Sequence, residues 1–168
     1  MTEAAPTARA NRRTSGRAQQ DHIRDPYQAR QKLRGPTVCT ECGAVYQRGR
    51  WQWGRAPDGA HRDTCPACRR IADRMPAGSV TLHGDFAKAH KAEIVGLMRN
   101  EEAQERQEHP LNRIVGISET DDGLSIETTD INLPHRLAHA LKSAFHGEVR
   151  MHFDEAGYFL RVDWTPPA

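Results

Sequence analysis

The chain has 168 residues, a formal net charge of +2 at pH 7 and 27% charged residues. This length suits one ordinary domain, or a small metal-stabilised module beside a domain of about 90 residues. Only 6% of the residues are aromatic, so we expect a modest core in which a metal supplies part of the folding energy. The sequence contains no run of 18 apolar residues and no apolar secretory signal, which argues against a membrane protein or a secreted one.

Charge is distributed unevenly along the chain. Residues 1–76 carry 15 Lys and Arg against 7 Asp and Glu, whereas residues 77–168 carry 9 against 15. A basic first half is typical of proteins that bind a polyanion, most plausibly nucleic acid. Arg-rich segments can also serve solubility alone, and this interpretation stays open.

Residues 1–36 are predicted to form a flexible basic arm. The segment is rich in Arg, Gln, Ala and Thr, has few large apolar residues, and contains Pro26 and the breaker Gly35-Pro36. Arginine-rich segments of this kind can fold when they bind RNA.

Residues 37–76 are predicted to form a zinc ribbon. All four cysteines of the chain lie here in two CxxC pairs separated by 22 residues: Cys39, Cys42, Cys65 and Cys68. Four thiolates in this pattern give one structural Zn²⁺ a closed tetrahedral shell. Between the pairs, residues 44–53 are expected to form a β-hairpin that turns at Gly49, and a short helical turn after the second pair is expected to end before Pro76.

Two other uses of these cysteines stay open. Cys65-Pro66-Ala67-Cys68 resembles the CPxC motif of glutaredoxins, and a cationic helix start lowers the pKa of a thiol, so a thiol-redox protein using Cys65 is an alternative. An iron–sulfur cluster is another possible occupant. A second CxxC pair just upstream favours zinc, and thiols that hold a metal indicate a reducing cytoplasm.

An arginine–tryptophan cluster is the predicted nucleic-acid interface. Tryptophans stack on unpaired bases while guanidinium groups contact phosphates. The period-two spacing of Trp51 and Trp53 also fits a second interpretation, in which these rings pack the ribbon core or dock the ribbon on the following domain. The candidates are Arg48, Arg50, Trp51, Trp53, Arg55, Arg69 and Arg70.

Residues 77–168 are predicted to form an α+β domain. Apolar residues repeat at helical spacing in two segments and alternate in the others, with turn residues between them. Asn132 is expected to cap the second helix. The expected order is a strand at 80–83, a helix at 86–107, strands at 112–119 and 124–129, a helix at 132–146, and strands at 149–154 and 158–164.

The last hairpin suggests how these elements pack. Val149, Met151 and Phe153 alternate with the polar Arg150 and His152, which indicates one buried and one wet face. We therefore expect a small antiparallel sheet covered by two helices on one side. The element order predicts a ferredoxin-like split βαβ fold with an extra strand.

Nothing in the sequence reads as a catalytic set. The phosphate-loop, dinucleotide, nucleophile-elbow and HExxH motifs are all missing, so we expect a non-enzymatic protein. His135 and His139 have metal-ligand spacing, but Arg136 and Lys142 lie among them, which favours a polar, partly cationic helix face.

Two resemblances bear on function. The strings CTECGAVYQRGRWQWG and CPACRRIADRMPAG, with HPLNRIVGI, IETTDINLPHRLAHAL and YFLRVDW further on, resemble a family of uncharacterised bacterial zinc-ribbon proteins over most of the chain. The four cysteines and, loosely, residues 126–141 also resemble the N-terminal part of the large-ribosomal-subunit export adaptors of archaea and eukaryotes. The chain lacks the adaptors' additional zinc-binding pairs, so an export role is not implied. The resemblance implies a partner in the ribosome or RNA.

The sequence therefore predicts a cytoplasmic, non-enzymatic zinc-ribbon protein that binds RNA and associates with the ribosome. The alternative is a protein-interaction adaptor without RNA contact, whose working surface is the acidic second half. No membrane or small-molecule partner is expected.

Overall fold

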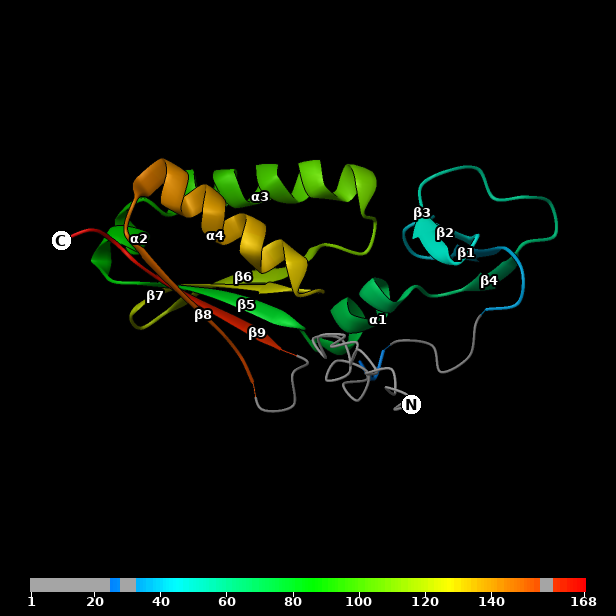
Figure 1. The fold of residues 1–168 in the computed structure, drawn as a ribbon, viewed down its shortest axis with the longest axis horizontal. Helices are drawn as coiled ribbons and strands as arrows, with labels where there is room; N and C mark the ends of the chain where they lie inside the picture. The colour runs from blue at the N-terminus through cyan, green and yellow to red at the C-terminus, as the bar shows by residue number, and fades with distance from the viewer. Residues whose placement is uncertain (1–24, 28–32, 155–158) are drawn as a thin grey trace, which may run out of the picture.

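The computed structural model describes residues 25–27, 33–154 and 159–168. Most of the predicted basic arm lies outside these residues. The described part contains two mixed sheets and four helices, and the α+β class is confirmed. Figure 1 shows the small sheet at one end of the molecule and the larger sheet, with its helices, toward the C-terminus. The small sheet is built from residues before 64 and the large sheet from residues after 77. We call residues 37–76 the ribbon module and residues 77–168 the α+β domain.

The small sheet belongs to the ribbon module and has the strand order β3-β2-β1-β4. Strand β1 pairs antiparallel with β2 and parallel with β4. The predicted hairpin is confirmed as β2 and β3, and it turns at Arg48 and Gly49, whose φ values are 55° and 82°. Two positive φ values in a two-residue turn match the twist of paired strands. The strands are β1 (Thr37–Cys39), β2 (Val45–Gln47), β3 (Arg50–Gln52) and β4 (His61–Asp63).

Helix α1 (Pro66–Asp73) follows the small sheet directly. Cys65 is its N-cap, and Pro66 occupies the first turn, where a missing N–H costs no hydrogen bond. Arg74 ends the helix in the left-handed conformation, with φ 52°. The helix therefore begins at one of the predicted metal ligands.

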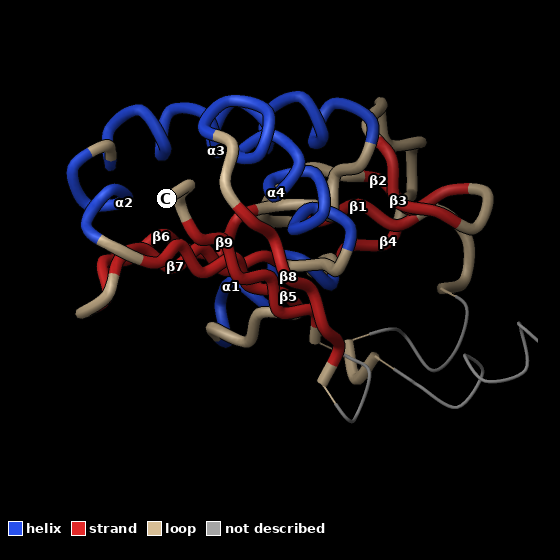
Figure 2. The backbone as a smooth tube through the Cα atoms, turned by 60° about the vertical axis from the view of Figure 1, so that its left-hand side comes forward, coloured by secondary structure: helices blue, strands red, loops and turns tan. Residues whose placement is uncertain are grey.

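The large sheet has the strand order β6-β7-β5-β9-β8. The long helices α3 and α4 both cover the same face of it, as Figures 1 and 2 show, and the core lies between them and the sheet. Fully buried side chains such as Leu82, Ile126, Leu137 and Trp164 fill this core. The elements are β5 (Gly78–His83), α2 (Asp85–Ala89), α3 (Lys91–Glu108), β6 (Ile114–Thr120), β7 (Gly123–Thr128), α4 (Asn132–Phe145), β8 (Glu148–Phe153) and β9 (Leu160–Thr165).

The prediction of a purely antiparallel sheet is wrong, because β9 pairs in parallel with β5. The last hairpin places β9 inside the sheet and β8 at its edge. Leu160, Val162 and Trp164 suit the inner position because all three are buried, whereas Met151 and Phe153 of β8 are 41% and 53% exposed. Since β9 separates β8 from β5, the expected ferredoxin-like arrangement is not confirmed.

The prediction of two helices in this domain also needs correction. The expected helix at 86–107 is divided into α2 and α3 at His90, whose φ is −106° and ψ 22°. The His90 ring stacks on Phe86, with ring centroids 4.0 Å apart, and its Nδ1 lies 3.1 Å from the Phe86 carbonyl oxygen. These local contacts stabilise the break.

The cap of α4 differs from the prediction as well. Asp130, rather than Asn132, supplies the side-chain acceptor, because its carboxylate accepts hydrogen bonds from the backbone N–H groups of Asn132 and Leu133. A carboxylate here satisfies two free N–H groups and faces the positive end of the helix dipole.

Candidate metal centre and nucleic-acid interface

The four cysteine thiols converge on one point of the ribbon module. Cys39 Sγ lies 3.8 Å from Cys68 Sγ, and Cys42 Sγ lies 3.8 Å from Cys65 Sγ. All four sulfur atoms lie within 4.8 Å of one another, and all four are free thiols. This cluster can hold a metal ion, as the CxxC spacing predicted.

Local backbone geometry brings each pair of sulfurs together. In the first pair the chain curls tightly, since Gly43 N–H donates to the Cys39 carbonyl and Cys39 N–H donates to the Ala44 carbonyl. Gly43 has φ 79°, a conformation that L side chains rarely adopt. In the second pair, the first turn of α1 places Cys68 beside the N-cap Cys65, and the Cys68 N–H lies 3.4 Å from Cys65 Sγ.

Backbone N–H groups and burial shift the pKa values of the thiols in opposite directions. Burial alone would raise the pKa of Cys39, but hydrogen bonds from the N–H groups of Cys42 and Cys65 lower it to about 6. Burial raises the pKa of Cys42 and, more strongly, that of Cys65. The N–H groups therefore favour a negative charge on Cys39. The positive charge of a bound cation would stabilise the thiolate forms of the other buried cysteines.

A residue of the α+β domain completes the surroundings of the thiols. Arg113 lies between α3 and β6, is 6% exposed, and donates from Nη2 to Cys68 Sγ over 3.0 Å. Sequence reasoning missed it, because 45 residues separate it from Cys68 and only the tertiary structure brings them together. Leu111, two residues earlier, packs against the cysteine cluster.

The two tryptophans of the predicted interface have different surroundings. Trp51 packs edge-on against Tyr46, with ring centroids 5.5 Å apart, and against the cysteine cluster. Trp53 donates from its indole Nε1 to the Arg106 carbonyl on α3 over 2.6 Å, and the Arg106 guanidinium lies 5.6 Å from its ring centroid. Trp53 is still 38% exposed. Packing and docking, the second interpretation of these residues, are therefore both observed.

The predicted arginines divide into three groups. Arg48, Arg50 and Arg55 are exposed on or beside the β2–β3 hairpin, and within the described residues none of them forms an ion pair. Arg69 is exposed but pairs with Asp63 over 2.7 Å. Arg70 is buried and donates to Asp25 and to the Met75 carbonyl, so its guanidinium is not available to a phosphate.

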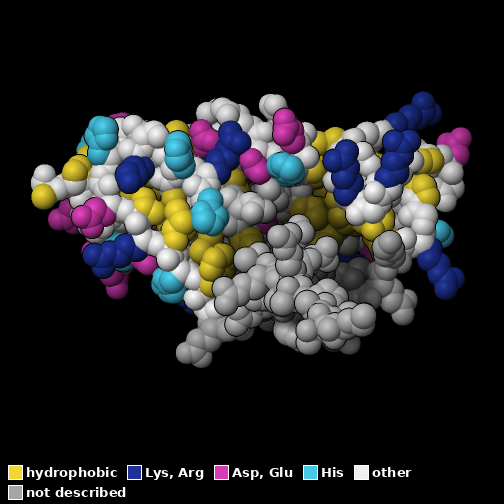
Figure 3. Space-filling view, in the orientation of Figure 1, with side chains coloured by type: hydrophobic (Ala, Val, Ile, Leu, Met, Phe, Trp, Pro, Cys, Tyr) yellow, Lys and Arg dark blue, Asp and Glu magenta, His cyan; other side chains and the backbone are white. Residues whose placement is uncertain are grey.

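The surface reflects this division. Figure 3 shows Lys and Arg side chains around the end of the molecule that the small sheet forms, with few acidic side chains among them on this face. Along α3, by contrast, acidic and basic side chains are paired: Glu101 and Glu105 form ion pairs with Arg136 at 2.7 and 3.0 Å.

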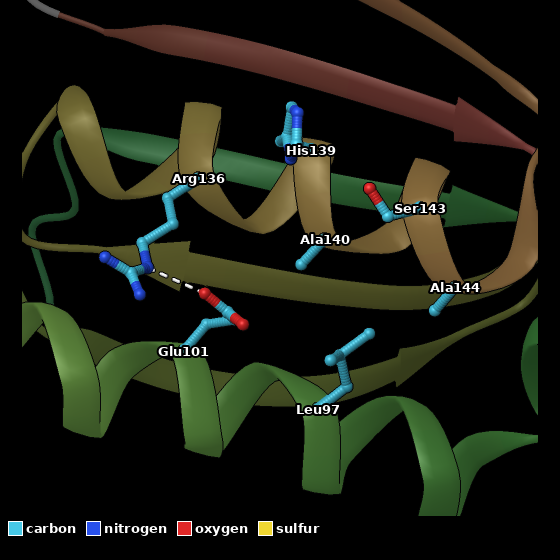
Figure 4. A pocket seen from close by; sticks show the side chains of 7 residues that line it. All are labelled: Leu97, Glu101, Arg136, His139, Ala140, Ser143 and Ala144. Carbon is cyan, nitrogen blue, oxygen red and sulfur yellow. Dashed lines mark hydrogen bonds and ion pairs between the residues drawn. The ribbon is translucent and has the colours of Figure 1, made fainter.

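A shallow pocket of about 550 Å³ lies between α3 and α4. Figure 4 shows Arg136 and Glu101 pointing toward each other across it, with Leu97 and Ala140 further along the groove. His139 lines the pocket, but among the described residues only the four cysteines group as metal ligands. The arginine in this pocket is already neutralised, so the cysteine cluster is the stronger candidate site.

Comparison with protein-family models and with curated protein sequences gives no match. No helix in the described part of the chain combines the length and apolar character needed to cross a membrane.

Proposed function

We propose that the chain is a cytoplasmic, non-enzymatic zinc-ribbon protein that binds RNA and associates with the ribosome. The observation that carries the proposal is the exposure of Arg48, Arg50 and Arg55 on the hairpin arm of the ribbon module, without ion-pair partners among the described residues. Exposed guanidinium groups without carboxylate partners are available to phosphates.

The geometry of the thiols supports zinc as the metal. Zinc binds cysteine sulfur at about 2.3 Å, which places two sulfurs of a regular tetrahedron about 3.8 Å apart. The distances from Cys39 to Cys68 and from Cys42 to Cys65 are both 3.8 Å. Four protein ligands leave no open position on the ion, so zinc would hold the hairpin arm in place and would not act on a substrate.

The hairpin arm would present its cations to the RNA backbone. The tight turn at Arg48 and Gly49 places Arg48 and Arg50 at the tip of β2 and β3, and Arg55 follows β3. The exposed part of Trp53, two residues before Arg55 in the sequence, would offer an aromatic surface. Contacts of this type select unpaired or irregular RNA rather than a particular base sequence.

The buried position of Cys65 weighs against the thiol-redox alternative. Its side chain is 0% exposed and lies among the other three thiols, whereas a reactive thiol must reach its substrate. The adaptor alternative rests on the acidic α+β domain, and the experiment below separates it from RNA binding.

Co-sedimentation of the zinc-loaded protein with ribosomes, at low and high salt, tests the proposal. We expect migration with a ribosomal fraction at low salt and its loss at high salt, because phosphate contacts weaken steeply as salt rises. Replacing Arg48, Arg50 and Arg55 with Gln should abolish the migration. The matched control has Gln in place of Lys142, Arg150 and Arg161, which are exposed cations of the α+β domain. We expect this control protein to migrate with the ribosomal fraction at low salt.

Two results would contradict the proposal. A protein that stays at the top of the gradient at both salt concentrations does not bind the ribosome. Co-sedimentation that resists high salt and survives the triple substitution would instead favour the protein adaptor.

A further inference from the structure

A buried arginine joins the two parts of the molecule at the thiol cluster. Arg113 belongs to the α+β domain, yet its guanidinium lies against Cys68 of the ribbon module. The Nε atom of Arg113 is buried and has no hydrogen-bond partner within the described residues. A buried cation is costly unless an anion lies beside it, so the occupancy of the thiol cluster matters to this side chain.

Hydrogen bonds within the α+β domain fix the backbone of Arg113. Its backbone N–H donates to Thr129 Oγ1 over 2.9 Å, and its carbonyl accepts from the Thr129 N–H over 2.9 Å. Thr129 directly follows β7 and is itself buried. The position of the guanidinium is therefore set by the large sheet, and the ribbon module must bring Cys68 to it.

A metal ion in the cluster would supply both a counter-charge for Arg113 and a fixed position for the sulfur that Arg113 binds. Four thiolates around a divalent cation carry a net charge of −2, and Arg113 Nη2 donates to one of these sulfurs, Cys68 Sγ, over 3.0 Å. Cys68 belongs to the ribbon module, so the ion would hold its sulfur where the guanidinium, fixed by the large sheet, can reach it. Loss of the ion would remove the bond that ties Cys68 Sγ to the other three sulfurs, and the buried guanidinium would lose a fixed partner.

We propose that Arg113 is a positioning residue of the metal centre, and that the loaded centre holds the ribbon module against the α+β domain through it. Metal release and separation of the two parts are then one event. This inference rests on the metal of the proposed function but not on RNA binding.

Two smaller contacts between the two parts accompany the Arg113 contact: Leu111 packs against the cysteine cluster, and Trp53 contacts α3. Trp53 reaches α3 through the Arg106 carbonyl at an exposed position, and one neutral hydrogen bond of this kind contributes only about 1 kcal/mol. Such a contact does not hold two units together alone. We therefore expect it to open when the Arg113 contact is lost.

The test compares zinc transfer and overall size in Arg113→Gln, Arg113→Lys and the wild type. Zinc transfer to a chromogenic chelator reports the metal centre, and the radius of gyration from small-angle scattering reports docking. We expect Arg113→Gln to bind one zinc, to transfer it about 10-fold faster or more, and to have a larger radius while loaded. Arg113→Lys should be intermediate, because it keeps the charge without the planar fork.

The control is Arg99→Gln, since Arg99 lies on α3, is exposed and pairs only with Glu102 among the described residues. It should match the wild type in both readouts. An Arg113→Gln variant with the wild-type transfer rate and radius would overturn the inference.

A second measurement serves if Arg113→Gln does not fold. Removing zinc from the wild-type protein leaves the Arg113 side chain intact, and we expect the radius to increase while the circular-dichroism signal of the α+β domain is kept. An unchanged radius after metal removal would overturn the inference. A wild-type chain that binds no metal would overturn both this inference and the zinc proposal, whatever its affinity for RNA.

Discussion

The ribbon module and the α+β domain are built on different kinds of core. The core of the α+β domain contains large apolar side chains such as Leu82, Met98 and Trp164, all fully buried. The buried cluster of the ribbon module consists of three cysteines and two alanines. A cluster this small cannot offset the conformational entropy of the segment. Apolar burial can therefore hold the α+β domain, whereas the ribbon module has little apolar core and instead gathers four thiols that can hold a metal ion.

Removing one thiol should have the largest effect, and we expect it to be confined to the ribbon module. Cys65→Ser removes one buried thiol of the cluster and keeps a side chain that can cap α1, and structural zinc contributes roughly 10 kcal/mol or more at neutral pH. We expect the bound zinc to fall from one per chain to none, with loss of amide protection in the ribbon module alone. Metal analysis and hydrogen exchange measure this, with Thr40→Ser, an exposed residue of the first knuckle, as control. Persistent protection of β1 to β3 without metal would contradict it.

A cavity in the α+β domain should destabilise this domain and leave the ribbon module unchanged. Leu137→Ala empties a fully buried position on α4 and should lower the free energy of unfolding of this domain by about 2–5 kcal/mol. The zinc content should stay at one per chain. Urea unfolding followed by circular dichroism gives the free energy, and Lys142→Ala on the exposed face of the same helix is the control. Loss of zinc at urea concentrations that leave this control unaffected would show that the ribbon module depends on the large core.

Acidity should affect the α+β domain through Asp130. Burial raises the pKa of this carboxyl to about 6, although N–H groups of α4 oppose the shift; the charge of Glu105 adds to it and that of His109 opposes it. A pKa above the unfolded value means that the folded state binds the proton more tightly. Its contribution to stability is therefore present below about pH 4 and is lost as pH rises toward 6.

The matching variant is Asp130→Asn, which can still cap α4. We expect the wild-type free energy of unfolding, measured by urea titration of the α+β domain between pH 4 and 7, to contain a decrease that the variant lacks. The decrease should be at most about 3 kcal/mol, since one pKa unit corresponds to about 1.4 kcal/mol. Parallel pH profiles for the two proteins would show that Asp130 titrates normally.

The smallest expected effect concerns the contact between the two parts. Trp53→Phe keeps an aromatic ring but removes the N–H that binds the Arg106 carbonyl, at a cost of about 1 kcal/mol. We expect faster amide exchange at the C-terminal end of α3 and unchanged zinc content. Trp51→Phe is the control, because Trp51 packs within the ribbon module and not on α3. Equal exchange in both variants would mean that the Trp53 contact does not contribute to docking.

Local patterns predicted much of this structure. The CxxC spacing predicted the thiol cluster, Gly49 marked the hairpin turn, and apolar residues at helical spacing predicted a helix at 132–146, where α4 buries Leu133, Leu137 and Leu141. In each case the residues that form the feature are near one another in the sequence. The physical cause, a ligand pair, a positive φ or a helical stripe, can therefore be read directly.

Features that depend on distant residues were not predicted. The insertion of β9 between β5 and β8, the parallel pairing of β1 with β4 and the contact of Arg113 with Cys68 all join residues that are far apart in the sequence. The alternation in β8 matched a buried strand, yet only the sheet order shows that β9 takes the inner place. The predicted boundaries at residues 36 and 76 and the RNA contacts remain predictions.

The salt dependence of RNA affinity tests the central claim most directly. The zinc-loaded wild type and the variant with Arg48, Arg50 and Arg55 replaced by Gln would be titrated with single-stranded ribosomal RNA between about 50 and 200 mM salt. Each phosphate contact on a single strand contributes about 0.7 to the slope of log affinity against log salt, so three arginines should account for about two units. A variant slope shallower by about two would support RNA binding by the hairpin arm. Identical slopes and affinities in the two proteins would contradict it.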